Sequence, residues 1–198
     1  MKLVVGLGNP GPKYETTRHN VGWLALDHLI DAWKADGPKS KFNAEYWTAT
    51  VGGEKVILAK PQTFMNLSGQ AIAPLAGFYK CAPADIIVVY DEVDLKPGAL
   101  RIKTGGGSGG HNGIKSLDSS LGSPEYHRVR IGVGHARDVH PGMDLADYVL
   151  GQFTQTECET LEGVFANVAK AAELLIAGDA RKAMNVYNTA PKADAKQG

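Results

Sequence analysis

The chain has 198 residues, of which 43% are hydrophobic and 21% are charged, a balance that excludes a disordered or membrane-embedded protein. Its formal net charge is zero, so bulk charge does not indicate a nucleic-acid partner. The two cysteines, Cys81 and Cys158, form no zinc, redox or disulfide pattern, and without a signal peptide or a membrane-length apolar run the sequence predicts a cytoplasmic protein.

The N-terminal third predicts one strand, one helix and one hairpin. Residues 3–7 are apolar and partly β-branched, as in a short buried strand, and a run of glycine and proline ends them. A helix is expected from about Thr17, with apolar residues at helical spacing, until Asp-Gly-Pro at 36–38 ends it. Residues 44–51 and 54–59 read as two strands around a Gly-Gly pair.

The middle of the chain predicts one helix and three further strands. Residues 67–80 suit a helix, although Pro74 should kink or shorten it. Residues 86–90, Ile-Ile-Val-Val-Tyr, are the strongest strand candidate in the sequence. Residues 100–103 and 129–133 are weaker candidates. The region between these two is expected to hold a glycine-rich loop and a short helix.

The C-terminal part is expected to be helical. Residues 146–150 suit one helical turn, 156–177 form the clearest amphipathic helix and 180–187 a shorter one. The tail 189–198 is small and polar and is expected to fray. Because strands alternate with helices and no composition break marks a boundary, residues 1–188 predict a single α/β domain with a mixed β-sheet flanked by helices.

A glycine pattern follows the first strand. Residues 6–11, Gly-Leu-Gly-Asn-Pro-Gly, match the dinucleotide-binding pattern G-x-G-x-x-G, which would suggest a nicotinamide oxidoreductase. That pattern needs a helix opening inside it, and here prolines delay the helix. The expected acidic residue is also missing, because Asp27 and Asp31 fall within the predicted helix. The alternatives are an ordinary strand-to-loop turn, or a rigid turn that presents Asn9 to a site; no cofactor is expected.

His19 falls in the predicted first turn of a helix. Such a histidine is most often an ordinary surface residue. The positive end of the helix dipole, however, disfavours imidazolium, so the ring is expected to stay neutral near pH 7. A neutral imidazole can accept a proton from water. His19 is therefore a candidate general base.

Asp91 is the candidate partner of that base. It ends the strand 86–90, and sites in α/β sheets gather at the carboxyl ends of strands. A carboxylate there could orient His19 and stabilise its charge. The alternatives are a plain acidic turn or, with Glu92 and Asp94, a metal site. No histidine at ligand spacing accompanies them, so no metal is expected.

Two further segments bring polar groups to the ends of predicted helices. Residues 60–69 place Asn66 beside large apolar side chains just before a helix, where it could be an N-cap, a ligand-binding amide or both. Residues 105–113 hold five glycines around Ser108 and end in His-Asn-Gly before a helix. This stretch could be a flexible linker. It lacks the Lys-Ser/Thr of a Walker A loop, yet its backbone N–H groups could seat a phosphate or an oxyanion.

Basic residues concentrate around the glycine-rich loop. Residues 96–130 carry six basic against two acidic side chains, a local charge of +4 in a chain with no net charge. Arg101 and Lys103 precede the loop and Arg128 and Arg130 follow it, so they could add charge to a phosphate-binding patch. The alternative is a solvated basic face.

Five of these segments, in this order between residues 4 and 135, resemble the bacterial-type peptidyl-tRNA hydrolases. The matching stretches are VVGLGNPGPKYETTRHNVGW, KPQTFMNLSGQAI, YDEVDLKPGALRIK, GGHNGIKSL and HRVRIGVGH. The resemblance implies a twisted mixed sheet and a monomeric, metal-free esterase. Such an enzyme cleaves the ester between a peptide and the terminal ribose of tRNA and so releases the tRNA for reuse.

The resemblance also assigns roles to residues of this sequence. His19 matches the catalytic base and Asp91 its acidic partner. Other matching positions are the site amides Asn9, Asn66 and Asn112, the cleft residues Tyr14, Met65 and His111, and the tRNA-binding Lys103 and Arg130. Ser108 departs from the histidine of many relatives. A remaining alternative is an RNA-binding module without catalysis, but the presence of His19, Asp91 and the three asparagines argues against it.

Overall fold

The computed structural model describes residues 1–188, so the tail 189–198, predicted to fray, lies outside the described residues. A seven-stranded sheet runs in the order β2-β3-β4-β1-β5-β7-β6. Its strands are β1 Lys2–Gly6, β2 Asp36–Lys41, β3 Ala44–Val51, β4 Glu54–Pro61, β5 Ile86–Glu92, β6 Leu100–Thr104 and β7 His127–Gly132. The central strands β4, β1, β5 and β7 pair in parallel, and β2, β3 and β6 add antiparallel edges. The predicted mixed sheet is confirmed.

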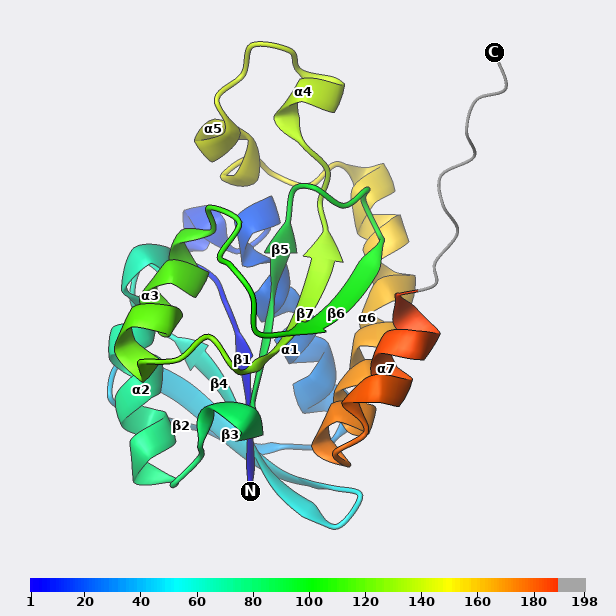
Figure 1. The fold of residues 1–198 in the computed structure, drawn as a ribbon. Helices are drawn as coiled ribbons and strands as arrows, with labels where there is room; N and C mark the ends of the chain where they lie inside the picture. The colour runs from blue at the N-terminus through cyan, green and yellow to red at the C-terminus, as the bar shows by residue number, and fades with distance from the viewer. Residues whose placement is uncertain (189–198) are drawn as a thin grey trace.

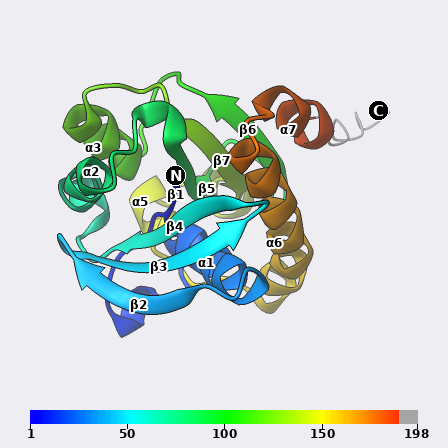
Figure 2. The same ribbon diagram turned by 90° about the horizontal axis from the view of Figure 1, so that it is seen from below.

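Helices cover both faces of the twisted sheet (Figures 1 and 2). The helices are α1 Val21–Ala32, α2 Ser68–Phe78, α3 Asn112–Leu121, α4 Ala136–Val139, α5 Leu145–Val149, α6 Gln155–Ile176 and α7 Ala180–Tyr187. Single 3-10 turns lie at Pro12–Tyr14, Arg18–Asn20, Met65–Leu67 and Pro83–Asp85. Helices α2 and α3 pack on one face, and α1, α6 and α7 on the other.

The apolar character of the central strands follows from burial on both faces. In β1, Leu3 and Val5 pack toward α2 and α3, whereas Val4 packs toward α1 and α6. A strand with helices on both sides has no polar face, which is why residues 3–7 and 86–90 read as continuous apolar runs. Both of these predicted strands are confirmed.

The structure corrects two boundaries in the N-terminal third. Helix α1 begins at Val21 rather than near Thr17, because a 3-10 turn at Arg18–Asn20 precedes it. Residues 36–38, predicted only to end the helix, open the edge strand β2, which covers residues 36–41. Their sequence, DGPKSK, is polar and largely exposed, so it lacks the alternation that marks a half-buried strand. Elsewhere, α2 continues through Pro74 to Phe78.

Parallel pairing places the carboxyl ends of β1 and β5 side by side at one edge of the sheet. The loop that leaves β1 carries Asn9, Asp91 is the penultimate residue of β5, and α3 begins at the same edge after the glycine-rich loop. The short helices α4 and α5 project beyond this edge (Figure 1). Among the described residues, no helix is both long and apolar enough to cross a membrane.

Candidate active site

A cleft of about 430 Å³ opens at the carboxyl edge of the sheet. One wall is the segment before α2, a second is the start of α3, and α5 forms a roof. The lining residues are Asn9, His19, Phe64, Met65, Asn66, Asp91, Glu92, Val93, Gly109, Gly110, His111, Asn112, Leu145, Ala146, Val149 and Leu150. Polar groups at the floor and apolar side chains at the walls are the usual composition of a ligand-binding cleft.

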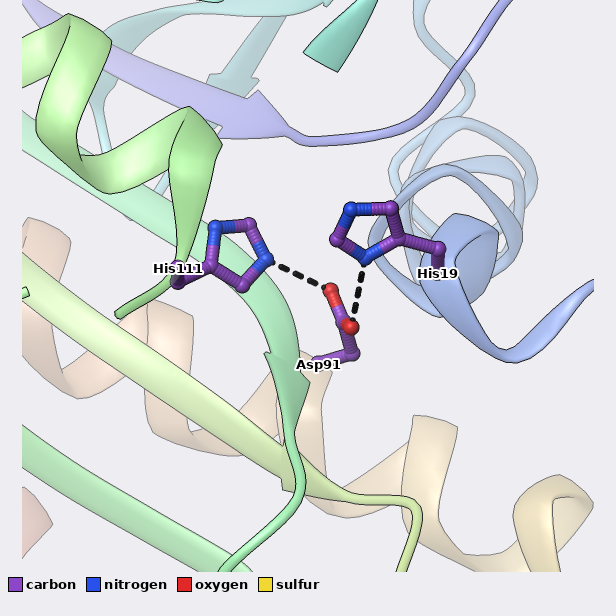
Figure 3. A group of neighbouring side chains, drawn as sticks. All are labelled: His19, Asp91 and His111. Atoms are coloured by element: carbon purple, nitrogen blue, oxygen red, sulfur yellow. Dashed lines mark hydrogen bonds and ion pairs between the residues drawn. The ribbon is translucent and has the colours of Figure 1, made fainter. Parts of the chain in front are cut away.

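At the floor of the cleft, Asp91 lies between two histidines (Figure 3). Its Oδ2 is 2.7 Å from Nδ1 of His19, and its Oδ1 is 2.8 Å from Nε2 of His111. The Asp91 side chain is only 2% exposed. Both carboxylate oxygens therefore have a ring nitrogen as partner, and the predicted His19–Asp91 pair is present.

The hydrogen bonds of His111 fix its tautomer. Its Nδ1 accepts the backbone N–H groups of Gly113 and Ile114 at 3.1 and 3.4 Å, so His111 is the N-cap of α3. A nitrogen that accepts these bonds carries no proton, which leaves the proton on Nε2, where it is donated to Asp91. His111 thus holds Asp91 in place, and both of its ring nitrogens are occupied.

The same reasoning leaves one atom of His19 available. Since the Asp91 carboxylate can only accept, the proton of neutral His19 lies on Nδ1 and its Nε2 is unprotonated. No hydrogen bond within residues 1–188 engages that Nε2. The ring is 13% exposed and lines the cleft. A base with a free Nε2 and a carboxylate behind it can take a proton from water in the cleft.

The electrostatics of the pair correct one expectation about His19. Burial would lower the pKa of His19, but the charge of Asp91 and its hydrogen bond outweigh burial and raise that pKa above its ordinary value. For Asp91, burial would raise the pKa, yet the two histidines and their hydrogen bonds hold it far below the usual range. A helix dipole would lower this pKa, so the direction that the sequence predicts for His19 is wrong; His19 precedes α1, and Asp91 governs the shift.

His19, Asp91 and His111 could also be considered as metal ligands, because one potential ligand atom from each lies within 4.8 Å of the others. The donor set argues against this. To bind a metal through Nε2, neutral His111 would carry its proton on Nδ1, directly opposite the N–H groups of Gly113 and Ile114. The hydrogen bonds that cap α3 therefore oppose metal binding.

Asn9 is fixed by two interactions from other segments. Its Oδ1 accepts the backbone N–H of Met65 at 2.7 Å, so its Nδ2 must point elsewhere, and it lines the cleft. The Asn20 side chain bonds both the N–H and the C=O of the Asn9 backbone at 2.9 Å. Asn20 was not among the predicted site residues, because nothing in the sequence indicates which backbone its amide meets.

The other predicted cleft residues separate into three groups. Met65 is buried in the wall, and Asn66 and Asn112 are exposed at the rim with their amides unpaired within residues 1–188. The possibility that Asn66 caps a helix is ruled out, because α2 has no side-chain cap. Tyr14 does not line the cleft; it lies in a separate 3-10 turn, with the Lys13 ammonium over its ring.

The roof and part of one wall were not predicted as site residues. Phe64 is 57% exposed on one side of the cleft, and the α5 region contributes apolar side chains on the other. These are Leu145, Val149 and Leu150. A signal existed in the sequence, namely large apolar residues within otherwise polar loops, but composition alone does not distinguish a cleft wall from a core contact.

The basic residues around the glycine-rich loop lie on one face of the β6–β7 pair. Arg101 is opposite Arg130, and Lys103 is opposite Arg128. Arg128 is fully buried and donates to the carbonyls of Gly106 and Gly107 and to Asp118, so it holds the loop rather than facing solvent. The idea that Arg128 adds charge to a phosphate site is therefore wrong.

Lys103 and Arg130 are partly exposed on this face, and Nζ of Lys103 donates to the carbonyl of Gly107 at 3.3 Å. Burial and then the charges of Arg130 and Arg128 lower the pKa of Lys103, and together they outweigh the opposing charges of Glu92 and Asp118. Arg130 is 21% exposed and only 4.0 Å from Glu92, and its buried Nε has no partner within the described residues. Arg101 instead reaches the backbone carbonyl of Asn188.

The glycines of residues 6–11 serve close packing. A Cβ on Gly6 would lie 2.5 Å from the carbonyl oxygen of Gly22 in α1, and one on Gly8 would lie 2.6 Å from the Trp23 ring. No helix opens inside the motif, because α1 starts only at Val21. A dinucleotide site would need a helix N-terminus facing the pyrophosphate, and the motif has none. The structure instead contains the turn that presents Asn9 to the cleft.

Comparison with known proteins gives one consistent result. The family model described as peptidyl-tRNA hydrolase matches residues 3–196. The peptidyl-tRNA hydrolase of Geobacillus kaustophilus is 45% identical over 188 residues, which cover 95% of this chain and 100% of the relative. That of Brucella ovis is 47% identical over 191 residues, covering 93% of this chain and 74% of the relative.

The fold comparison agrees. The crystal structure of peptidyl-tRNA hydrolase from Acinetobacter baumannii superimposes with a TM-score of 0.88 at 37% sequence identity. The match covers 98% of this chain and 97% of the other. The similarity therefore extends over the sheet, both helical layers and the roof of the cleft.

Proposed function

The chain belongs to the peptidyl-tRNA hydrolase family and hydrolyses peptidyl-tRNA, and from that premise we propose that His19 is the general base of the reaction. One observation carries the proposal. Asp91 fixes the His19 proton on Nδ1, so the one basic nitrogen left in the histidine pair is Nε2 of His19, in the cleft. The bond to be cleaved is the ester between the peptide and the 3′-terminal ribose.

In the proposed reaction, Nε2 of His19 takes a proton from water while the water oxygen attacks the ester carbonyl carbon. The Asp91 carboxylate stabilises the imidazolium that results. The tetrahedral intermediate then collapses, the C–O bond to the ribose breaks, and His19 returns the proton to the ribose oxygen. The products are a peptide carboxylic acid and tRNA, and neither cysteine takes part.

The oxyanion of the intermediate requires hydrogen-bond donors in the cleft. Nδ2 of Asn9 is the best supported one, because the bond from Met65 to its Oδ1 aims the NH₂ group into the cleft. Asn112 offers its side-chain amide and its backbone N–H, the latter left free because His111 caps only the next two N–H groups. Asn66 at the opposite rim is proposed to bind the peptide backbone, beside Met65.

The substrate is proposed to lie across the cleft, with the tRNA toward Lys103 and Arg130 and the peptide between Phe64 and the α5 roof. The neighbouring cations on this face support the first placement and the apolar walls the second. We also propose a metal-independent monomer that acts in the cytoplasm; the capped tautomer of His111 supports metal independence, and the free thiols fit a reducing compartment.

The base assignment is tested by His19→Gln, assayed on an N-blocked aminoacyl-tRNA. A general base contributes about 10²–10⁴-fold to a rate, so kcat should fall by about that factor while KM changes little. The matched control is His28→Gln, a partly buried histidine on α1 outside the cleft. Near-normal turnover by His19→Gln would refute the assignment.

A further inference from the structure

Arg18, the residue before His19, is 8% exposed and has every part of its side chain engaged. Its Nε and Nη2 each lie 3.1 Å from a carboxylate oxygen of Glu157, so the pair is bidentate. Its Nη1 donates to the carbonyl of Tyr148 at 3.1 Å, and the guanidinium stacks 4.3 Å from the centre of the Tyr148 ring. Arg18 thus joins the His19 turn to α6 and to the cleft roof.

From Tyr148, the contacts continue around the cleft to Asp91. The Tyr148 hydroxyl donates to the carbonyl of Val133 at 2.7 Å, and the Val133 N–H donates to the carbonyl of Glu92 at 3.0 Å. Glu92 follows Asp91 directly in the chain. The series Arg18–Tyr148–Val133–Glu92 therefore connects the residue before the base with the residue after its carboxylate.

The neighbouring backbone reinforces this connection. The Arg18 N–H donates to the carbonyl of Gly151 at 3.1 Å, and the Phe153 N–H donates to that of Thr16 at 3.1 Å. At Gly151, a Cβ would approach Nη1 of Arg18 to 2.7 Å, so the guanidinium needs a glycine there. The segment that carries His19 and the segment that ends the roof are thus attached along their length.

We propose that Arg18 is a positioning residue for the hydrolysis: through Tyr148 it fixes the distance between His19 and Asp91 and, with the same contacts, the roof of the cleft. The proposal rests on His19 being the base. Arg18 does not touch the reacting atoms. A lysine could keep the positive charge but could not make the bidentate pair and the stacking contact together.

The test compares Arg18→Lys and Arg18→Gln with the wild type in kcat, KM and the pH dependence of kcat/KM. Loosening the His19–Asp91 pair removes what raises the pKa of His19, so that pKa falls. Because the reaction needs unprotonated Nε2, the acid limb of the profile should move to lower pH. We expect kcat to fall about 10-fold in Arg18→Lys and further in Arg18→Gln, since small displacements can cost up to about 10²-fold.

Two further variants make the test decisive. Tyr148→Phe removes only the hydroxyl bond to Val133, so it should shift the acid limb in the same direction with a smaller loss of kcat, even if Arg18→Gln fails to fold. The matched control is Arg137→Lys, because Arg137 lies on α4 and forms an exposed ion pair with Asp94. This variant should change neither kcat nor the position of the acid limb.

The outcomes separate this inference from the proposed function. If the Arg18 and Tyr148 variants lower only the melting temperature, with kcat and the acid limb unchanged well below it, Arg18 is merely structural and the inference is wrong. In that case His19→Gln would still abolish turnover. If His19→Gln itself retains turnover, the base assignment fails first, and the inference fails with it.

Discussion

The floor of the cleft and the basic face of β6–β7 contain similar numbers of polar side chains but use them differently. At the floor, the polar side-chain atoms of Asp91 and His111 are all paired, whereas Nε2 of His19 and Nδ2 of Asn9 have no partner within residues 1–188. On the basic face, the two Nη groups of Arg128 donate to the glycine-rich loop, Pro124 and Asp118, whereas the one ion pair of Arg130 within the described residues is the 4.0 Å contact with Glu92. The buried Nε of each arginine has no partner there. The cleft atoms without a hydrogen-bond partner inside the fold, rather than the residue types, therefore indicate which groups can act on a substrate.

The floor and the basic face also differ in their electrostatic energies. At the floor, hydrogen bonds orient Asp91 and His111, and such preorganisation is what stabilises a transition state. The basic face carries like charges that repel, which lowers the pKa of Lys103 after the effect of burial. An arriving phosphate relieves that repulsion, so we interpret the first region as prepared for chemistry and the second for binding.

The largest effect is expected from Asp91→Asn, which tests whether Asp91 determines the tautomer of His19. His111 can only donate from Nε2, so the oxygen of the new amide must face His111 and its NH₂ must face Nδ1 of His19. That forces the His19 proton onto Nε2 and removes the base. We expect kcat to fall by about 10³–10⁴-fold, as when the carboxylate of a catalytic triad becomes an amide.

The control for this variant is its fold and its KM. Both should stay close to wild type, because an asparagine has the size of an aspartate and the side chains proposed to bind tRNA are untouched. If Asp91→Asn kept more than a tenth of the wild-type kcat, His19 would not depend on Asp91 for its tautomer, and the contrast between the two regions would lose its basis.

The next effect separates structural from binding cations on the basic face. Arg128 is fully buried. Arg128→Met removes the donors to the carbonyls of Gly106 and Gly107 and the ion-pair partner of Asp118. Breaking a buried ion pair costs about 3–5 kcal/mol, and because Asp118 is 26% exposed we expect about 3 kcal/mol. Urea unfolding measures this loss. Stability within 0.5 kcal/mol of wild type, a limit set by about that much scatter among surface variants, would contradict the assigned role.

Much of the fold could be predicted from sequence because its strongest elements are local. The apolar runs of β1 and β5 and the amphipathic pattern of α6 specify their own structure. Strand β2 could not be predicted in this way, since its polar residues become a strand only when β3 supplies hydrogen bonds at the sheet edge. Tertiary pairing, rather than local propensity, determines that element.

The site was predictable to a different extent. His19 and Asp91 could be paired from their positions at a helix start and a strand end, and the structure places them 2.7 Å apart. The direction of the His19 pKa shift could not be predicted from sequence, because it depends on burial and on a partner 72 residues away. For Arg128, sequence gives the charge but not its burial, and burial decides whether a cation binds the loop or the substrate.

The smallest effect is expected at Lys103 and Arg130, the two partly exposed cations of the basic face. Lys103→Ala and Arg130→Ala should each raise KM for the tRNA substrate about 10-fold and leave kcat and stability nearly unchanged, since each removes one phosphate contact and about 1–2 kcal/mol of binding. The salt dependence is the sharper readout. Each lost contact should reduce the slope of log(1/KM) against log salt by about 0.7–0.9. Lys170→Ala, an exposed lysine on α6 across the sheet, is the matched control and should keep the wild-type slope. Equal slopes in all four proteins would mean that the tRNA lies elsewhere and that Lys103 and Arg130 do not contact its phosphates.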